Sequence, residues 1–429
     1  MFKYMREREL ASMATVTHVS KGRIVTVVVL IASIAASFVA GYFSRSLLRA
    51  GQQEVVTVKI GALLPLSGDL ASFGKRNQNA LQLAQEDINN FAAAVGSRFR
   101  FQMVFEDTAT DPQVARSKIE ALAAQGIKAF IGPMSSGEVS QVKQYADSHH
   151  LVVISQSSTA IALAISGDYI FRVVPPDTYQ GQALAKYVMF RGFKKAVAIY
   201  RNDAWGVGLF ESFAKTFQAL GGTVEGVAYD PSAREFTAEV ARAADLAQRL
   251  GAGAAVVLIS FEEGIQIIKL AAQNPALSQL TWFGTDGLAR STKLAAEACS
   301  ETVALGGLPS TIFVPTSNPL QEAFIARFRQ RFGENPDSYS MNAYDAAWLI
   351  ALSVMLTGDY DGEKIASVLP QVASRYYGIT GTIQLDENGD RKAGDYGVFQ
   401  LFKTAAGCEW KLVATYHIST GTVTPLQQG

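Results

Sequence analysis

The sequence predicts an α/β protein of two doubly wound lobes, and three observations carry this prediction. From Val55 onward, short apolar runs rich in β-branched residues alternate with amphipathic helical patterns. Near-continuous apolar strands separated by such helices are typical of parallel sheets that are covered on both faces. A composition break at 171–181, FRVVPPDTYQG, separates one series of strands and helices from a second series that begins at Lys194. Two such series in one chain indicate two lobes.

The chain begins with a segment that predicts a membrane span. Residues 24–44 carry no charge, and about twenty helical residues span roughly 30 Å, the thickness of a bilayer core. Basic residues predominate before this segment, so we expect 1–23 to be a cytoplasmic tail. Residues 45–54 would then form a linker, and the rest of the chain would lie outside the cytoplasm. A cleaved signal peptide is the alternative, although the apolar run exceeds the usual length for one.

The individual elements follow from the apolar runs in chain order. In the first series, strands are expected at 57–66, 99–107, 128–132 and 151–155, with helices at 79–91 and 114–125. In the second series, strands are expected at 195–200, 223–229, 254–260 and 280–285, with helices at 181–190, 209–220 and 264–273. A further strand at 302–309 (TVALGGLP) leads to helices at 321–332 and 338–356. Three antiparallel strands are expected within 379–402 and 409–416, with turns at 387–389 and 405–407.

Composition and charge exclude several classes of function. Lys and Arg number 38 and Asp and Glu number 38, so the chain lacks the basic surplus of a nucleic-acid-binding protein. Two cysteines exclude a disulfide scaffold and a multi-cysteine zinc module, while pairing of Cys299 with Cys408 stays open. The sequence has neither a phosphate-binding loop nor a nucleophile elbow. We therefore expect no metal, no cofactor and no enzymatic activity.

Three motifs that resemble functional signatures have simpler interpretations. Gly206-Val207-Gly208 lacks the third glycine of a dinucleotide-binding loop and is more typical of a helix start. His149 and His150 end a helical stretch without acidic or cysteine partners at ligand spacing, so we expect solvated residues at a helix end. Residues 386–390 share part of a calcium loop but lack its spaced ligands and terminal glutamate, which favours a solvated turn.

Hydroxyl groups follow two strands of the first series. Ligands bind beyond the carboxyl ends of the strands in open α/β sheets, so these positions are candidates for a site. Ser135 and Ser136 open a helix, where they are either a cap or a binding site for a carboxylate. Ser157 and Thr159 follow the next strand in a loop with several hydroxyls and carbonyls. The alternative for this loop is an ordinary polar connection.

A carboxylate and aromatic rings occupy the corresponding positions elsewhere. Asp286 follows the strand at 280–285, where it either caps the next helix or balances an ammonium group. Trp205 and Phe261 follow two other strands of the second series, and Phe73 lies in the loop after the first strand. Such rings suit a pocket wall or the core. Anion-binding donors on one lobe and a carboxylate with rings on the other would allow a zwitterion to connect the lobes.

With these residues, the chain resembles the extracytoplasmic solute-binding proteins of ABC transporters, branched-chain amino acid (Leu/Ile/Val-binding protein-like) type. The resemblance extends from about 55 to about 415, and the order and spacing of several segments make it specific. These segments are IGALLPLSGDLASFGKRNQNALQLAQEDIN, FEDTATDPQVARSKIEALAAQGIKAFIGPMSSG, FRVVPPDTYQGQALAKYV, AIYRNDAWGVGLFESF, WFGTDGL, YDAAWLIA and GITGTIQLDENGDR.

The resemblance implies the type I periplasmic-binding-protein (Venus flytrap) fold, in which three hinge crossings join the two lobes. The crossings are expected near 174–177, 306–310 and 378–381. The expected boundaries are 55–175 and 307–380 for lobe 1, and 176–306 and 381–429 for lobe 2.

The resemblance also implies a role for each candidate site residue. Ser136 would hold the carboxylate of the ligand, with help from the next strand-end loop. The carbonyl of Ser157, the hydroxyl of Thr159 and the carboxylate of Asp286 would hold its ammonium group. At Gln156 the family often has proline, and relatives bind amides, aromatic acids or urea, so the ligand class stays open. The ring positions that match the pocket wall are Phe73, Trp205 and Phe261.

The function implied is the capture of a small molecule, in the first place a branched-chain or other apolar amino acid, and its delivery to the permease subunits of an ABC transporter. The ligand would bridge the lobes and stabilise a closed state reached by a hinge motion. The alternatives are a ligand-sensing ectodomain of a receptor and a binder of amides or aromatic acids. We expect residues 24–44 to hold the protein at the cell membrane, and we expect no nucleic-acid partner.

Overall fold

The computed structural model describes residues 54–426 of the chain. These residues divide into two compact units. The smaller unit includes the described residues 54–56 and 90–100, and the larger unit includes 57–89 and 101–426. The candidate site described below lies wholly within the larger unit.

The N-terminal expectations fall outside this part of the chain. The predicted tail (1–23), the predicted span (24–44) and all but the last residue of the predicted linker (45–54) are not among the described residues. Within the described part, no helix combines the length and the apolar character that crossing a bilayer requires. The anchor therefore stays a prediction.

Five strands form the first sheet. They are β1 (Val56–Leu64), β2 (Phe99–Asp107), β3 (Ala129–Ile131), β4 (Val152–Ser155) and β5 (Ile170–Arg172). Their order is β2-β1-β3-β4-β5, and the pairs from β1 to β5 are parallel. The four strands predicted for the first series are confirmed, and the short β5 falls in the composition break.

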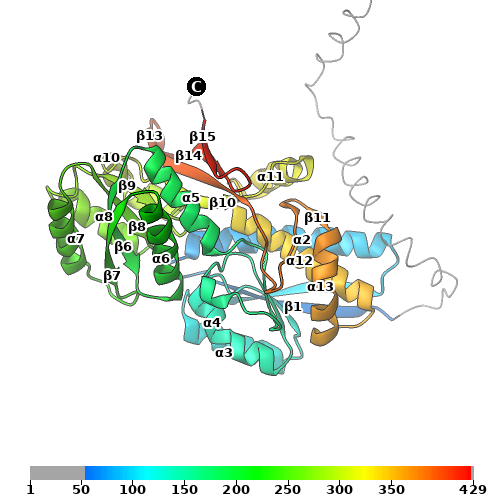
Figure 1. The fold of residues 1–429 in the computed structure, drawn as a ribbon. Helices are drawn as coiled ribbons and strands as arrows, with labels where there is room; N and C mark the ends of the chain where they lie inside the picture. Colours follow the sequence, from blue (N-terminus) through cyan, green and yellow to red (C-terminus); the bar gives the residue numbers. More distant parts are fainter. Residues whose placement is uncertain (1–53, 427–429) are drawn as a thin grey trace, which may run out of the picture. The chain divides into compact units, whose positions relative to one another are not determined.

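Helices from two distant parts of the chain accompany this sheet (Figure 1). They are α2 (Ala71–Ala94), α3 (Pro112–Ala124), α4 (Ser136–Ser148), α11 (Pro319–Phe332), α12 (Ser338–Thr357) and α13 (Gly362–Arg375), with the 3₁₀ turn η1 (Ile161–Leu163). Helix α4 contacts β4, and α12 and α13 contact β3 and β4. The late segment 338–375 thus returns to the first sheet, as a two-lobed chain with several crossings requires.

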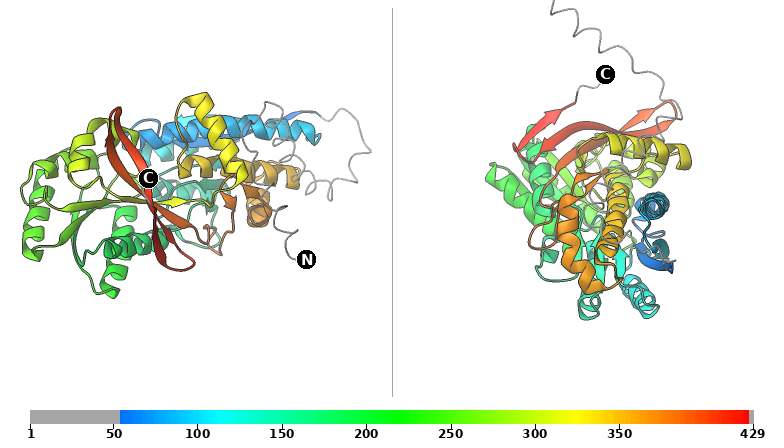
Figure 2. Two further views of the ribbon diagram at one scale, coloured as in Figure 1. Left: turned by 90° about the horizontal axis from the view of Figure 1, so that it is seen from above. Right: turned by 90° about the vertical axis from the view of Figure 1, so that its right-hand side faces the viewer.

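Eight strands form the second sheet. They are β6 (Lys195–Arg201), β7 (Thr223–Tyr229), β8 (Ala254–Ile259), β9 (Thr281–Gly284), β10 (Ser310–Val314), β13 (Asp395–Thr404), β14 (Gly407–His417) and β15 (Thr422–Pro425). Their order is β15-β14-β13-β10-β9-β8-β6-β7. Figure 2 shows β13, β14 and β15, coloured orange to red, together at one edge.

Helices cover both faces of the second sheet. They are α5 (Asp177–Phe190), α6 (Ala204–Ala219), α7 (Thr237–Leu250), α8 (Gly264–Gln273), α9 (Thr292–Glu297) and α10 (Cys299–Ala304). In β6, Ala196 and Ala198 pack in one apolar cluster with α5 and α6, whereas Val197 and Ile199 pack in another with α7 and α8. Successive side chains of a strand point to opposite faces, so this alternation confirms the predicted doubly wound arrangement.

The predicted strand at 302–309 is wrong. Residues 299–304 form helix α10, and two glycines with positive φ values, Gly306 (92°) and Gly307 (74°), follow its C-cap Leu305. A short apolar run does not distinguish a strand from a buried helical turn by periodicity. The strand lies slightly later, as β10, and it pairs with β9 and β13 in the second sheet. The segment 310–314, which we assigned to lobe 1, therefore belongs with the elements of lobe 2, while the other lobe boundaries stay predictions.

The C-terminal strands are only partly as predicted. The antiparallel pair β13 and β14 is confirmed, and β15 was missed. The expected strand near 379–385 is reduced to the two-residue strands β11 (Tyr377–Gly378) and β12 (Gly381–Thr382). Arg391 accounts for this irregular path, because its guanidinium donates to the carbonyls of Thr380, Thr382 and Val173.

The turn at 386–390 is not fully solvated, contrary to the prediction. Asp386 accepts hydrogen bonds from the backbone N–H groups of Asn388 and Asp390, as a turn requires. Asp390, however, is 1 % exposed and forms a buried ion pair with Arg172, which is also 1 % exposed. Nothing in the residues around this turn indicated the partner, because Arg172 lies in the strand β5 of the first sheet.

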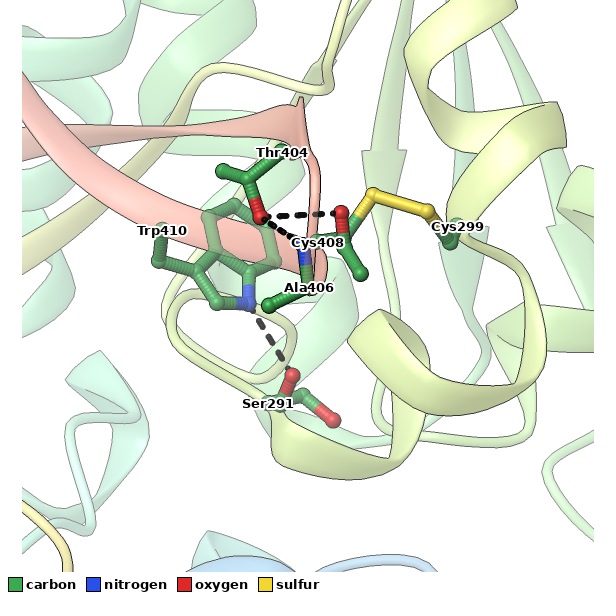
Figure 3. The surroundings of a disulfide bond; sticks show 7 residues. Ser291, Cys299, Thr404, Ala406, Cys408 and Trp410 are labelled. Atoms are coloured by element: carbon green, nitrogen blue, oxygen red, sulfur yellow. Dashed lines mark hydrogen bonds between the residues drawn. A yellow bond between two sulfur atoms is a disulfide. The ribbon is translucent and has the colours of Figure 1, made fainter.

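The two cysteines form a disulfide, which the sequence left open. Cys299 at the start of α10 is joined to Cys408 in β14 (Figure 3). Beside the bond, the indole Nε1 of Trp410 donates to the carbonyl of Ser291 at 3.0 Å (Figure 3). The disulfide thus fixes the β13–β14 hairpin to the helices that follow β9.

The other two motifs behave largely as expected. Gly206 and Gly208 lie in the first turns of α6, which confirms a helix start. His149 is the C-cap of α4, and both it and His150 are exposed. His150 does have an acidic partner, because its Nδ1 lies 2.8 Å from the carboxylate of Glu363 in α13.

Candidate functional site

The start of α4 contributes two serines with different tasks. The side chain of Ser135 accepts from the N–H of Glu138, and the N–H of Ser135 donates to Glu138 Oε2 at 3.0 Å, which completes a capping box. The Ser135 hydroxyl also donates to Oε2, at 2.6 Å. Burial raises the pKa of the Glu138 carboxyl. The cap interpretation is therefore confirmed for Ser135, and its hydroxyl is committed to the helix rather than to a ligand.

Ser136 links α4 to the loop that follows β4. Its Oγ accepts from the backbone N–H groups of Thr159 at 3.2 Å and Ala160 at 3.1 Å and from the hydroxyl of Ser158 at 3.0 Å. All three partners donate to Ser136, so its own hydroxyl hydrogen is available to another acceptor. Because Ser136 also lies at a helix N-terminus, that hydrogen is placed where a carboxylate is favoured.

The loop after β4 is more than an ordinary polar connection. Ser157 Oγ donates to the carbonyl of Met134 at 2.9 Å, and the Thr159 carbonyl accepts from the N–H of Asp177 at 2.9 Å. Thr159 Oγ1 is buried, and its hydroxyl is a hydrogen-bond partner of the Asp177 carboxylate. A hydroxyl that donates still has lone pairs with which to accept, so this atom is a candidate for contact with a ligand donor.

Asp286 follows β9 and is buried, but it caps no helix. Helix α9 begins later and is capped by Ser291, so the alternative of a helix cap is wrong. Asp286 accepts from Gln180 Nε2 at 2.8 Å and from the Tyr339 hydroxyl at 2.6 Å. Burial raises the pKa of Asp286, and burial with the neighbouring Asp286 carboxylate raises the pKa of Tyr339 well above its ordinary value. The phenol therefore stays a hydrogen-bond donor to the carboxylate.

A second buried carboxylate, that of Asp177, was missed in the sequence. Asp177 begins α5 directly after the pair of prolines in the first predicted crossing. Both of its oxygens are buried, and the hydroxyl of Thr159 is a side-chain hydrogen-bond partner of this carboxylate. Burial, and then the carboxylate of Asp286, raise the pKa of Asp177 well above its ordinary value. The position after VVPP at a helix start was the available signal.

Aromatic rings close the site on the other side. Trp205 and Phe261 are stacked, with ring centroids 4.6 Å apart and an angle of 25° between the rings. Phe73 lies opposite Tyr339 with a centroid distance of 6.3 Å. These four rings share one small cavity, so the predicted wall residues are not simply core residues.

Together these side chains surround a single cavity. Every predicted site residue lines it except Thr159, which lies just behind Ser136. The complete lining is Leu70, Phe73, Met134, Ser135, Ser136, Ser157, Trp205, Phe261, Asp286, Gly287 and Tyr339. Residues that follow strands of the first sheet thus meet residues that follow strands of the second.

The cavity is small. Its volume is about 20 Å³, roughly the space that one water molecule needs. Next to the lining residues Leu70 and Phe261, the N–H of Glu262 donates to the carbonyl of Asp69 at 3.1 Å. A molecule much larger than water fits only if the lining residues move apart.

The charge balance of the site favours a cationic group in its ligand. Asp177 and Asp286 bring two carboxylates into a buried region, while the nearby Arg172 is paired with Asp390. Within residues 54–426, no group of three or more His, Cys, Asp or Glu side chains is arranged to hold a metal. An uncompensated buried carboxylate is stabilised by a cationic partner or by protonation.

Comparison with known proteins places these observations in a family. Residues 76–404 match the family described as the receptor family ligand binding region. An uncharacterized protein of Methanocaldococcus jannaschii is 33% identical over 87% of this chain and 93% of its own. The leucine-, isoleucine-, valine-, threonine- and alanine-binding protein of Pseudomonas aeruginosa is 25% identical over 88% of this chain and 97% of its own.

A solved structure gives the same result for the fold. The leucine-binding protein of Thermotoga maritima matches with a TM-score of 0.70 and 23% identity, over 85% of this chain and 99% of that chain. The two-lobed type I periplasmic-binding-protein fold is therefore confirmed, as is the resemblance to solute-binding proteins of branched-chain amino acid transporters. The chain belongs to the receptor family ligand binding region, as a relative of the Leu/Ile/Val-binding proteins.

Proposed function

We propose that this protein captures an apolar amino acid between its two lobes, outside the cytoplasm, and delivers it to an ABC transporter without altering it chemically. The observation that carries the proposal is the polarity of the cavity. A free hydroxyl at the N-terminus of α4 lies on the side of the first sheet, and the buried carboxylate of Asp286 follows β9 of the second sheet. A zwitterion bound between them would satisfy both groups at once.

The carboxylate of the ligand would be bound by Ser136. The oxygen of Ser136 accepts hydrogen bonds from two backbone N–H groups, which leave the hydroxyl hydrogen unused, and the helix dipole of α4 favours negative charge there. Hydrogen bonds to a charged group contribute about 1.5–3 kcal/mol each.

The ammonium group of the ligand would be bound by Asp286, Thr159 and Asp177. The hydroxyl of Thr159 and the carboxylate of Asp177 are buried and hydrogen-bonded to each other, and their remaining lone pairs could accept from an ammonium donor. The cation would also relieve the repulsion between the two carboxylates. The side chain of the ligand would then contact Phe73, Trp205 and Phe261, which favours an apolar group.

The proposal of delivery to a transporter rests on sequence similarity to known binding proteins. The Pseudomonas relative is named for binding small amino acids, and this chain covers nearly the whole of it. Residues 24–44 would hold the protein at the membrane beside the permease subunits. Recovery of the full-length chain in the membrane fraction after an alkaline wash would support the anchor, and its release into the soluble fraction would count against it.

Calorimetry with the purified full-length chain tests the binding site. We expect saturable binding of leucine, isoleucine or valine with one site per chain, and we expect no turnover of the ligand. A Ser136→Ala variant should weaken binding, whereas Ser148→Ala, at the exposed end of the same helix, should not. Equal affinities for the two variants would reject Ser136 as the carboxylate partner.

An aromatic acid is the second candidate ligand, because four rings line the cavity. Such a ligand has a carboxylate for Ser136 but no ammonium group for Asp286. Benzoate would therefore bind an Asp286→Asn variant at least as tightly as the original protein, whereas leucine would bind it more weakly. Titration of both ligands into both proteins separates the two proposals.

A further inference from the structure

A buried arginine lies behind the aromatic side of the cavity without lining it. Arg201 ends β6 and is 7 % exposed. Its guanidinium carbon lies 4.1 Å from the ring centroid of Phe261. Its Nε donates to Asp203 at 2.9 Å, and its Nη1 donates to Glu263. The planar guanidinium thus has two carboxylate partners and one ring partner.

These carboxylate partners lie at the starts of two helices, α6 and α8, next to the two stacked rings. Asp203 caps α6, because its Oδ1 accepts from the N–H of Gly206 at 2.8 Å, and Trp205 lies in the first turn of that helix. Glu263 is the N-cap residue of α8 and follows Phe261 by two positions. The hydroxyl of Tyr229 donates to the same oxygen of Glu263 at 2.5 Å, which fixes this carboxylate from a second side.

The ring stack therefore depends on one side chain. Trp205 and Phe261 are 4.6 Å apart and both line the cavity, whereas Arg201 does not. Arg201 connects the helix start that carries Trp205 with the segment that carries Phe261, and it also contacts the ring of Phe261 directly. A lysine would retain the charge but would lack the planar fork that reaches two carboxylates and stacks on a ring.

We propose that Arg201 is a positioning residue that sets the width of the aromatic side of the cavity and thereby selects ligand side chains by size. This inference rests on the proposed function, because it assigns the rings to the ligand side chain. Loss of the fork would let Phe261 and Trp205 move apart, which would admit a larger side chain and reduce contact with a smaller one.

The test uses Arg201→Lys, with Arg242→Lys as the matched control. Arg242 also forms an ion pair with a carboxylate in the same part of the fold, at 2.9 Å from Glu239, but on the surface. Calorimetry would give the Kd values for leucine and phenylalanine in each full-length variant. We expect the ratio of the two Kd values to shift by about tenfold toward phenylalanine in Arg201→Lys, the scale on which a pocket discriminates by size. The ratio in Arg242→Lys should not change.

An equal loss of affinity for both ligands in Arg201→Lys would overturn the proposal, because it would indicate general destabilisation. If the original protein binds neither ligand, the proposed function fails, and a ligand-free measurement then decides the positioning role. The fluorescence of Trp205 is obtained by subtracting the signal of a Trp205→Phe variant from that of the protein with Trp205. This subtraction is made once in the original protein and once in Arg201→Lys. Stronger acrylamide quenching of that contribution in Arg201→Lys supports the positioning role, and unchanged quenching overturns it.

Discussion

The buried pair of Arg172 and Asp390 permits a stringent test of the structure. Both side chains are 1 % exposed, and they join β5 of the first sheet to the segment that leads into β13. Arg172 Nε donates to Asp390 Oδ1 at 2.5 Å, and its Nη1 donates to the carbonyl of Ala160 at 2.7 Å. An Asp390→Ala change would remove the carboxylate and leave the guanidinium buried without its counter-charge.

The expected loss follows from this burial. Removing one partner of a buried ion pair costs about 3–5 kcal/mol in the free energy of unfolding. The double variant Arg172→Met/Asp390→Leu removes both charges and takes a donor from two carbonyls, that of Ala160 at 2.7 Å and, at the limit of a hydrogen bond, that of Ser158 at 3.4 Å, which costs about 1–3 kcal/mol. The double variant should therefore be more stable than the single Asp390→Ala variant.

Urea unfolding of the full-length chain, followed by far-UV circular dichroism, measures these differences. Glu239→Ala is the control, because Glu239 pairs with Arg242 at the surface, where an ion pair contributes about 0–1 kcal/mol. If Asp390→Ala lost no more stability than this control, the burial argument would be refuted. It would equally be refuted if the double variant were no more stable than Asp390→Ala.

Three further predictions concern the site and the disulfide. Asp286→Asn should weaken leucine binding by about 1.5–3 kcal/mol in calorimetry, as for a lost charge-assisted hydrogen bond, and unchanged affinity would exclude an ammonium contact. Burial raises the pKa of Asp177 above its unfolded value, so the folded state binds more protons, and its free energy of unfolding should fall as pH rises through and above the ordinary carboxyl range. Urea unfolding at several pH values should show a smaller fall in the free energy of unfolding for Asp177→Asn. An identical fall for both proteins would contradict the pKa shift. Replacing Cys299 and Cys408 by serine opens a link across a sequence separation of 109 and should lower stability by about 2–5 kcal/mol; equal melting temperatures with and without reductant would contradict it.

Most of the residues that line the cavity could be predicted from the sequence, because parallel strands align their carboxyl ends at one edge of a sheet. Ser136, Ser157 and Asp286 each follow a strand directly, so identifying the strands also located these residues. Their approach to one another across two sheets came from the resemblance, since nothing in the strand pattern fixes how two lobes face each other.

The residues that were missed depend on tertiary contacts. Tyr339 begins a helix far along the chain, and its contact with Asp286 exists only because α12 returns to the first sheet. Asp390 lies in a turn of surface-like composition, and only its approach to Arg172 makes it buried. The prediction of a strand at 302–309 was wrong for a local reason, because four apolar or β-branched positions fit one helical turn as well as a strand.

The narrowness of the cavity has a kinetic consequence. Room for about one water molecule means that a solute the size of leucine can enter only after the lining residues have moved apart. At high solute concentration the observed association rate should level off at the frequency of this opening, rather than rise without limit. The measured affinity is also reduced, by a factor equal to the fraction of molecules in the open, binding-competent conformation. A permease that recognised only the shut form would then also dock with unloaded copies.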